Sequence, residues 1–300
     1  TGCCAATIDG VTSGQGIMVV GGYSGGECDL SSCEAFIGNG GSNIDNCWTS
    51  VPSMTCRRRS AAATSWRGCV VVVGGSSGGT DVSRSCEMYV PVSGRWVTLP
   101  SLRRARSACS AVTVGLRFGE SEVEEDCVVV MGGVDADGNF VDDIELLRCV
   151  NADGSDAMEW QPFGKMPTPR SHFGAVALPG ARVLVIGGSS SKSQFMQSTE
   201  VYDVQRCLSS DSRGLPDQHA WAEIGKLRVP RAACTAAVVN SRVIVCGGWP
   251  RYGYSLKSVE VLEVQDIDNY SRATRDETIW EFAAPMAVAR GGCAAAVVRL

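Results

Sequence analysis

The sequence predicts an all-β fold, a β-propeller made of four-stranded blades, and three observations predict it. Gly-Gly pairs follow an apolar run five times, at intervals of 53, 58, 55 and 60 residues. A glutamate stands thirteen residues after the first glycine of every pair. Each unit also contains a tryptophan, with an arginine ten residues after it. A fixed period of this length is typical of repeat architectures, in which every unit is one supersecondary element.

The charged and aromatic repeat residues are expected to be structural. A buried charge persists only when a partner compensates it, so an arginine and a glutamate that recur in every unit are expected to hold the blades together. Tryptophan is large enough to pack between neighbouring blades. The structural set consists of Glu34, Glu87, Glu145, Glu200, Glu260, Trp48, Trp96, Trp160, Trp221, Trp280, Arg58, Arg106, Arg170, Arg231 and Arg290.

Each unit reads as four short strands, which we call a, b, c and d. Strand a follows the arginine and has small side chains, as in Ala108–Val114, which suits a position near a crowded central axis. Strand b is the apolar run that ends in Gly-Gly, as in Val183–Ile186, and its unbroken apolar character predicts burial on both faces. Strand c surrounds the glutamate and alternates with period two, as in Cys86–Tyr89. Strand d carries the tryptophan.

The repeat covers the whole chain, so we expect a single domain over residues 1–300. The approximate blades are 1–56, 57–104, 105–168, 169–229 and 230–288, with a partial unit at 289–300. Thr1–Ile8 reads as an a strand without its arginine, and Arg290–Leu300 reads as an a strand without the three strands that follow. We expect a six-bladed parent domain, and a five-bladed ring with a surplus strand is the alternative.

The combined motif resembles the kelch repeat over essentially the whole chain. The resemblance is carried by the Gly-Gly pair, the Glu-x-Tyr core of strand c, as in Glu87–Tyr89, the tryptophan and the proline-to-arginine segment. It implies a kelch-type propeller that recognises proteins, as a scaffold or as a substrate adaptor within a larger protein with further domains. Glu200–Asp203 is similar to the strand seen in adaptors of cullin-type ubiquitin ligases, in which a BTB domain precedes the propeller.

The b–c and d–a connections must emerge on the same face of the propeller, because the strands of a blade alternate in direction. This b–c/d–a face is expected to be basic and aromatic, whereas the opposite face is expected to be acidic. Tyrosine, tryptophan and arginine anchor protein interfaces, and guanidinium groups bind carboxylates. The expected ligand is therefore an acidic peptide or loop. The expected partner-binding residues are Tyr23, Arg57, Arg59, Arg103, Arg104, Phe195, Arg228, Trp249, Arg251, Tyr252 and Tyr254.

A less specific interpretation of the same loops stays open. Loop aromatics can simply cover neighbouring blades, and loop arginines can be solvated. The acidic side chains assigned to the opposite face are Glu120, Glu122, Glu124, Glu125, Asp126, Asp153, Asp156, Asp211, Asp217, Asp266, Asp268, Asp276 and Glu277, and Lys192 is assigned to the basic face.

Catalytic motifs are weak in this sequence. Gly22–Gly26 and Gly75–Gly79 match the G-x-S-x-G pattern, but a nucleophile elbow needs a helix after it, and a strand is expected here. His172 and His219 are expected on opposite faces, which disfavours a histidine-based metal centre. We therefore expect no enzymatic activity, no metal and no cofactor. The alternative is a kelch-type enzyme or metal-dependent specifier that uses the central mouth.

The amino-acid composition further restricts the class of partner and the cellular compartment that we expect. With 32 acidic and 27 basic residues the net charge is −5, which argues against a nucleic-acid partner. The apolar runs are far shorter than the roughly 20 residues of a membrane-spanning helix. Fifteen cysteines recur partly at equivalent repeat positions, and the chain has no CxxC motif, so we expect reduced thiols in the cytoplasm. A secreted protein with disulfides is the alternative, and its suspected reactive pairs are Cys28 with Cys33 and Cys3 with Cys4.

Overall fold

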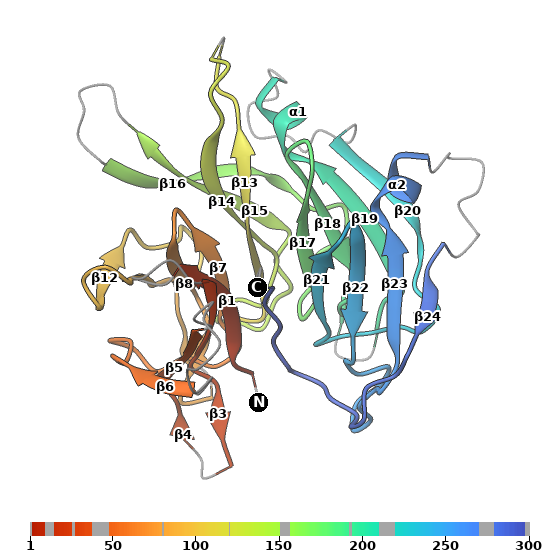
Figure 1. Ribbon diagram of the computed structural model, residues 1–300, viewed down its shortest axis with the longest axis horizontal. Coiled ribbons are helices and arrows are strands. Elements are labelled where there is room, and N and C mark those ends of the chain that lie inside the picture. The colour runs from red at the N-terminus through yellow and green to blue at the C-terminus, as the bar shows by residue number, and fades with distance from the viewer. Residues whose placement is uncertain are drawn as a thin grey trace, which may run out of the picture.

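The computed structural model contains five four-stranded antiparallel sheets arranged around a common centre, so the predicted β-propeller is confirmed (Figure 1). It describes residues 2–9, 15–25, 28–37, 48–79, 81–119, 121–150, 157–191, 194–209, 220–269 and 279–297. Within these ranges, no helix is both long enough and apolar enough to cross a membrane.

Every blade is a meander whose strands follow the order a, b, c and d. Blade 1 consists of β1 (Cys4–Asp9), β2 (Gln15–Val20), β5 (Cys33–Ile37) and β6 (Trp48–Val51). Blade 2 consists of β7 (Ala62–Trp66), β8 (Cys69–Val73), β11 (Cys86–Val90) and β12 (Arg95–Leu99). Blade 3 consists of β13 (Ser110–Leu116), β14 (Glu125–Met131), β15 (Asp143–Val150) and β16 (Ala157–Lys165).

Blade 4 consists of β17 (Gly174–Leu178), β18 (Arg182–Ile186), β19 (Ser198–Asp203) and β20 (Trp221–Lys226). Blade 5 consists of β21 (Thr235–Val239), β22 (Arg242–Cys246), β23 (Val259–Glu263) and β24 (Glu281–Ala283). The short helices α1 (Val204–Ser209) and α2 (Val264–Asn269) follow strand c in blades 4 and 5. Two small hairpins extend the b–c connections of blades 1 and 2, namely β3 (Tyr23–Ser24) with β4 (Cys28–Asp29) and β9 (Ser76–Ser77) with β10 (Asp81–Val82).

The Gly-Gly pairs are required where strand b approaches the next blade. The first glycine of each pair has φ between +58° and +63°, and the second has φ between +94° and +107°. A Cβ atom on Gly74 would overlap the carbonyl oxygen of Arg106 at the start of the next blade. A Cβ atom on Gly75 would press on Ala61 at the start of its own strand a. Both glycines therefore satisfy a backbone conformation and a close approach that other residues do not permit.

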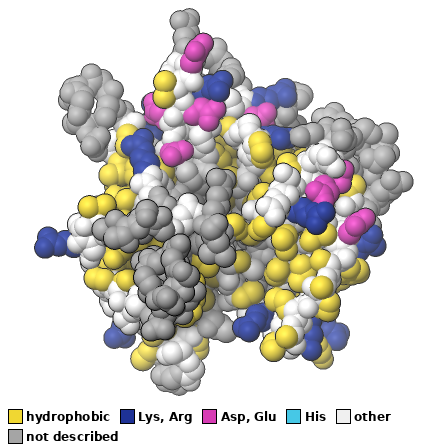
Figure 2. Space-filling view, in the orientation of Figure 1, with side chains coloured by type: hydrophobic (Ala, Val, Ile, Leu, Met, Phe, Trp, Pro, Cys, Tyr) yellow, Lys and Arg dark blue, Asp and Glu magenta, His cyan; other side chains and the backbone are white. Residues whose placement is uncertain are grey.

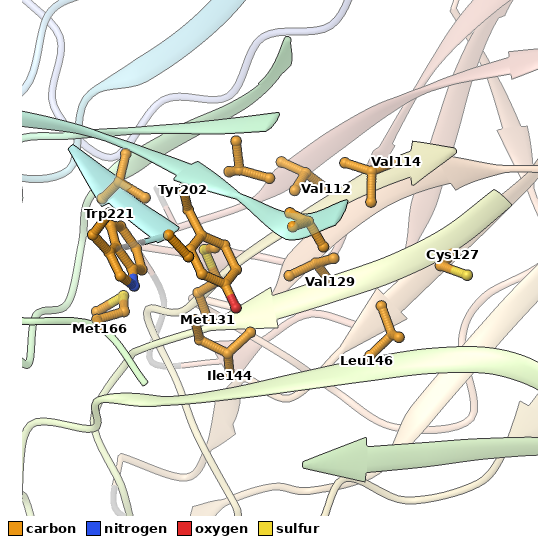
Figure 3. Packing of buried hydrophobic residues seen from close by; sticks show 14 of the residues in the cluster. Val112, Val114, Cys127, Val129, Met131, Ile144, Leu146, Met166, Tyr202 and Trp221 are labelled. Carbon is orange, nitrogen blue, oxygen red and sulfur yellow. The ribbon is translucent and has the colours of Figure 1, made fainter. Parts of the chain in front are cut away.

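The hydrophobic core lies between the sheets and not within any one of them. Between blades 3 and 4, Val129 and Met131 of β14 pack against Tyr202 and Trp221 of blade 4 (Figure 3). The rings of Tyr202 and Trp221 are stacked with their centroids 4.5 Å apart. Each blade thus buries its apolar residues against its neighbours, which is why the unit repeats instead of standing alone.

Six residues at one end of the axis form a closed ring of backbone hydrogen bonds. Each donates its N–H to the carbonyl of the ring residue of the adjacent unit, with N···O distances of 2.7–3.1 Å. The ring consists of Gly2, Ser60, Ala108, His172, Ala233 and Gly292. All six have φ between +51° and +70°. The ring therefore has six positions around five complete blades, and the C-terminal segment 291–297 occupies the sixth.

Candidate partner-binding face

The repeat arginines and glutamates form buried ion pairs in four blades. Arg231 and Glu260 are both fully buried, with 2.8 Å between Nη2 and Oε1. Arg231 also donates Nη1 to the carbonyls of Gly247 and Ser258 at 2.7 and 2.9 Å. The other carboxylate oxygen of Glu260 accepts the backbone N–H of Arg228 at 2.7 Å. This arrangement ties strand c to the d–a connection. The equivalent pairs are Arg58–Glu87, Arg106–Glu145 and Arg170–Glu200.

The repeat residues that flank the gap between blades 5 and 1 differ from the others. Glu34 and Arg290 are exposed, and neither has an ion-pair partner within the described ranges. Trp48 is 50% exposed. The equivalent indole N–H groups donate hydrogen bonds to the neighbouring blade, as Trp160 does to the carbonyl of Pro100 at 2.9 Å. Trp96 and Trp221 likewise donate to backbone carbonyls of the neighbouring blade, whereas Trp280 donates to Thr199 Oγ1 at 3.3 Å.

The mouth of the axis is a cavity of about 330 Å³ whose lining includes the six ring residues. Two aromatic side chains and one arginine from the expected binding set also line it, namely Tyr23, Trp249 and Arg59. The Arg59 guanidinium lies 5.6 Å from the centroid of the Tyr23 ring. Trp249 lies beside His172, with ring centroids 6.4 Å apart. Burial lowers the pKa of His172, so its imidazole is predominantly neutral near pH 7.

The rim of blades 4 and 5 carries a second aromatic group. Phe195 and Tyr252 meet edge to face, with centroids 5.1 Å apart, and connect the b–c loops of the two blades. The Arg251 guanidinium lies 3.9 Å from the centroid of Tyr254. Tyr252 is 62% exposed and Tyr254 is 56% exposed, so most of this group is available to a partner. We call these four residues the blade 4–5 rim.

Two of the expected arginines on this face form ion pairs with neighbouring aspartates. Arg104 pairs with Asp135 at 2.5 Å and with Asp143 at 3.0 Å, and these two carboxylates raise the pKa of Arg104. The Nε atom of Arg59 lies 3.5 Å from Oδ1 of Asp29. Sequence reasoning missed Asp29 and Asp135 as partners, although both occupy b–c loops next to the arginine-bearing connections. The face is therefore less basic than expected.

The remaining expected arginines lie apart from one another. Arg57 and Arg103 are exposed, and the backbone N–H of Arg103 donates to Glu145 at 2.7 Å. Arg228 donates Nε to the carbonyl of Trp280 at 2.6 Å, and its guanidinium lies 5.7 Å from the centroid of Phe282. Arg251 differs from Arg228 in lying closer to its aromatic ring, at 3.9 Å from the centroid of Tyr254.

Some of the acidic side chains expected on the opposite face are described and others are not. Glu122, Glu124 and Asp126 are exposed around the β13–β14 hairpin, and Asp266 is exposed on α2. Residues outside the described ranges are Glu120, Asp153, Asp156, Asp211, Asp217, Asp276, Glu277, Lys192 and His219, and the side chain of Asp268 is not described either.

The described residues with catalytic potential do not converge. Ser24 and Ser77, the serines of the two G-x-S-x-G matches, lie in the small b–c hairpins. Within the described ranges no group of three or more His, Cys, Asp or Glu side chains could hold a metal ion. None of the cysteines that the structure describes forms a disulfide, and these include Cys28 and Cys33. Burial raises the pKa of the Cys86 and Cys127 thiols to about 12, which keeps both protonated.

Comparison with known proteins finds sequences and a structure that are similar to this chain. A family model described as Kelch motif matches residues 57–103. The chain is 26% identical over 254 residues to Kelch-like protein 23 of Pongo abelii, covering 84% of this chain and 38% of that protein. It is 28% identical over 183 residues to the F-box/kelch-repeat protein SKIP30 of Arabidopsis thaliana, covering 59% of this chain and 44% of that protein.

Two further similarities extend this comparison. Beta-scruin of Limulus polyphemus is 25% identical over 239 residues, covering 76% of this chain and 24% of that protein. The chain spans less than half the length of each of these curated relatives. The solved structure of YjhT has the same fold, with a TM-score of 0.67 and 13% identity, covering 98% of this chain and 87% of that one. The repeat and the ring of blades are those of a β-propeller, and the chain is similar in sequence to kelch-repeat proteins.

Proposed function

We propose that this propeller is a protein-recognition module that binds an acidic segment of a partner protein on its b–c/d–a face, as an adaptor or scaffold of a larger protein in the cytoplasm. The observation that carries the proposal is the blade 4–5 rim, where Arg251 lies on the ring of Tyr254 beside the exposed Tyr252. Stacking holds the guanidinium plane in place while its edge stays free for a carboxylate.

The proposal divides the expected binding residues into two groups. Tyr23, Arg59 and Trp249 line the axial mouth and offer a recess for one inserted side chain. The blade 4–5 rim offers an aromatic, cationic surface next to Trp249. Arg104 contributes little free charge, because Asp135 and Asp143 neutralise it. We therefore place the main contact on blades 4 and 5.

The relatives support a binding role. Their printed names are those of kelch-like proteins, an F-box/kelch-repeat protein and a scruin. The alternative, an enzyme that uses the axial mouth, would have to place its chemistry around the neutral His172 and the ring residues.

The test is cross-linking mass spectrometry on the protein in its native extract, comparing the wild type with Arg251→Glu and with Tyr254→Ala. Both variants should lose the same cross-linked partners, and the wild-type complex should weaken as ionic strength rises, because salt screens exposed charges. Arg206→Glu is the matched control, since Arg206 is equally a surface arginine but lies on α1 in a c–d connection. If Arg206→Glu loses the partners while Arg251→Glu keeps them, the opposite face is the binding surface.

A further inference from the structure

A second cavity lies between blades 3 and 4, away from the axial mouth. It measures about 600 Å³, and none of the residues that line the axial mouth lines it. One wall comes from the end of β16 and the connection that follows it, and the other comes from strands c and d of blade 4. The lining consists of Asp142, residues 165–168, Glu200, Trp221 and Glu223. We call it the blade 3–4 cavity.

The repeat glutamate in this cavity lacks a hydrogen bond that its equivalents have. In blades 2, 3 and 5 the Oε2 atom of the glutamate accepts a backbone N–H at 2.7 Å from the residue seven positions after the preceding repeat tryptophan. These donors are Thr55, Arg103 and Arg228. The equivalent residue before blade 4 is Pro167, which has no N–H to donate. Glu200 Oε2 is therefore buried without a hydrogen-bond partner among the residues that the structure describes.

Blade 4 also places a second carboxylate opposite its repeat glutamate. Glu223 of β20 is the cross-strand partner of Glu200, so both side chains lie on the same face of the sheet. The equivalent partners in the other blades are uncharged, namely Ser50, Thr98, Pro162 and Phe282. On the face that Figure 2 draws, acidic side chains lie next to basic ones. Glu223, by contrast, is exposed and forms no ion pair within the described ranges, although like charges opposite each other destabilise a sheet.

The cavity already holds one alkylammonium group, which belongs to the chain itself. Lys165 Nζ lies 3.2 and 3.1 Å from the two carboxylate oxygens of Asp142 and 3.6 Å from Oδ1 of Asp143. These aspartates bind the only ammonium group in the lining, so none remains for Glu223. Apolar surface lies next to the carboxylates, because Met166 and Trp221 also line the cavity, and Figure 3 shows the two side chains together. Such surface suits the alkyl part of a chain with a charged end.

We propose that the blade 3–4 cavity binds an ammonium or guanidinium group carried on an alkyl chain, from a free polyamine or from a lysine or arginine side chain of a peptide. The charged group lies against the Glu223 carboxylate, and the alkyl chain packs on Met166 and Trp221. Glu200 Oε2 adds a negative field, which is strong because the oxygen is buried and has no donor. A metal ion is not the expected ligand, since no group of three or more His, Cys, Asp or Glu within the described ranges could hold one. The site uses no residue of the axial mouth or of the blade 4–5 rim, so it is independent of the proposed function.

The test is a titration of the protein, isotope-labelled at its tryptophan indoles, with putrescine at low ionic strength, followed by NMR. The indole N–H of Trp221 lines the cavity and donates to the Lys165 carbonyl at 3.0 Å, so its signal should shift until the site is saturated. The Trp249 signal, from the axial mouth, should stay in place. Trp221→Phe assigns the signal. Hexanoate, which has an alkyl chain with the opposite charge, should cause no shift.

Two variants test the carboxylates, and circular dichroism verifies that both are folded. Glu223→Gln should weaken putrescine binding about two- to fivefold, the range expected of an exposed ion pair. Pro167→Ala supplies the missing N–H to Glu200, so it should also weaken binding, because the hydrogen bond reduces the negative field in the cavity. Glu281→Gln is the matched control, since Glu281 is an exposed glutamate on strand d of blade 5, and it should bind putrescine as the wild type does.

Capped tripeptides with lysine or arginine at the centre distinguish the two sources of the ligand. Tighter binding of a tripeptide than of putrescine identifies a side chain of a polypeptide, and the reverse order identifies a free polyamine. The proposal is wrong if the Trp221 signal does not shift, or if hexanoate shifts it equally. It is also wrong if Glu223→Gln binds putrescine as well as Glu281→Gln does, or if Pro167→Ala leaves the affinity unchanged.

Discussion

Replacing Glu260 with glutamine is expected to destabilise the propeller strongly without changing its shape. Glu260 and Arg231 are both fully buried, and the carboxylate takes charge-assisted bonds from Nη2 and Nε of that arginine. Glutamine keeps the volume but removes the charge, and its amide group must face either the guanidinium or the Arg228 N–H, both donors. Leaving a buried charge without its partner costs about 3–5 kcal/mol.

The assay is thermal unfolding followed by circular dichroism, at pH 7 and fixed salt. At about 2 °C per kcal/mol for a large domain, the melting temperature should fall by roughly 6–10 °C. Glu34→Gln is the matched control, because Glu34 holds the same repeat position but is exposed, and surface substitutions usually stay within about 0.5 kcal/mol. Equal shifts for the two variants would refute the reasoning, since burial and pairing would then not decide the effect.

Three further outcomes are expected. Gly247→Ala should lower the melting temperature by several degrees, because its methyl group would overlap a backbone carbonyl of the next connection, whereas Gly253→Ala at a similar positive φ meets no neighbouring atom and should cost less. Burial holds the pKa of His172 below its usual value near 6.5, so the unfolded chain takes up the proton first as pH falls. The free energy of unfolding should therefore decrease as the pH is lowered through about 6.5. In melting curves, His172→Ala should remove that part of the pH dependence. In a thiol titration with Ellman's reagent, the exposed Cys28 should react rapidly, whereas the buried Cys127 should react only on unfolding.

The fold could be predicted because its determinants recur at fixed spacing. The first glycine of each pair meets the backbone of the next blade, so a Cβ atom there would clash. The glutamate follows thirteen residues later in all five units. The unbroken apolar character of strand b also predicted burial on both faces for β8, β14 and β18. For β2 and β22 the same apolar character was a poor guide, because burial on the second face depends on a neighbouring blade.

The binding face was harder to predict, because ion pairs between loops depend on geometry that has no fixed spacing. Arg104 and Asp135 are 31 residues apart in different blade connections, and no pattern in the sequence relates them. Treating each loop arginine as free charge therefore overstated the basic character of the face. Arg251 and Tyr254 are three residues apart in the same loop, so their contact is local, and the binding role of Arg251 stays a prediction.

The repeat also limits where specificity can reside. In blades 2 to 5 the repeat arginines and glutamates form equivalent ion pairs, so these pairs do not distinguish one blade from another. At the axial ring five of the six positions are glycine, serine or alanine, and His172 is the exception. On the rim, blades 4 and 5 are joined by the contact between Phe195 and Tyr252, which breaks the rotational symmetry of the face. Both departures involve blades 4 and 5, since His172 stands at the start of blade 4 and lies beside Trp249 of blade 5. We therefore expect a partner to bind the side formed by blades 4 and 5, which is why the binding test begins with Arg251 and Tyr254.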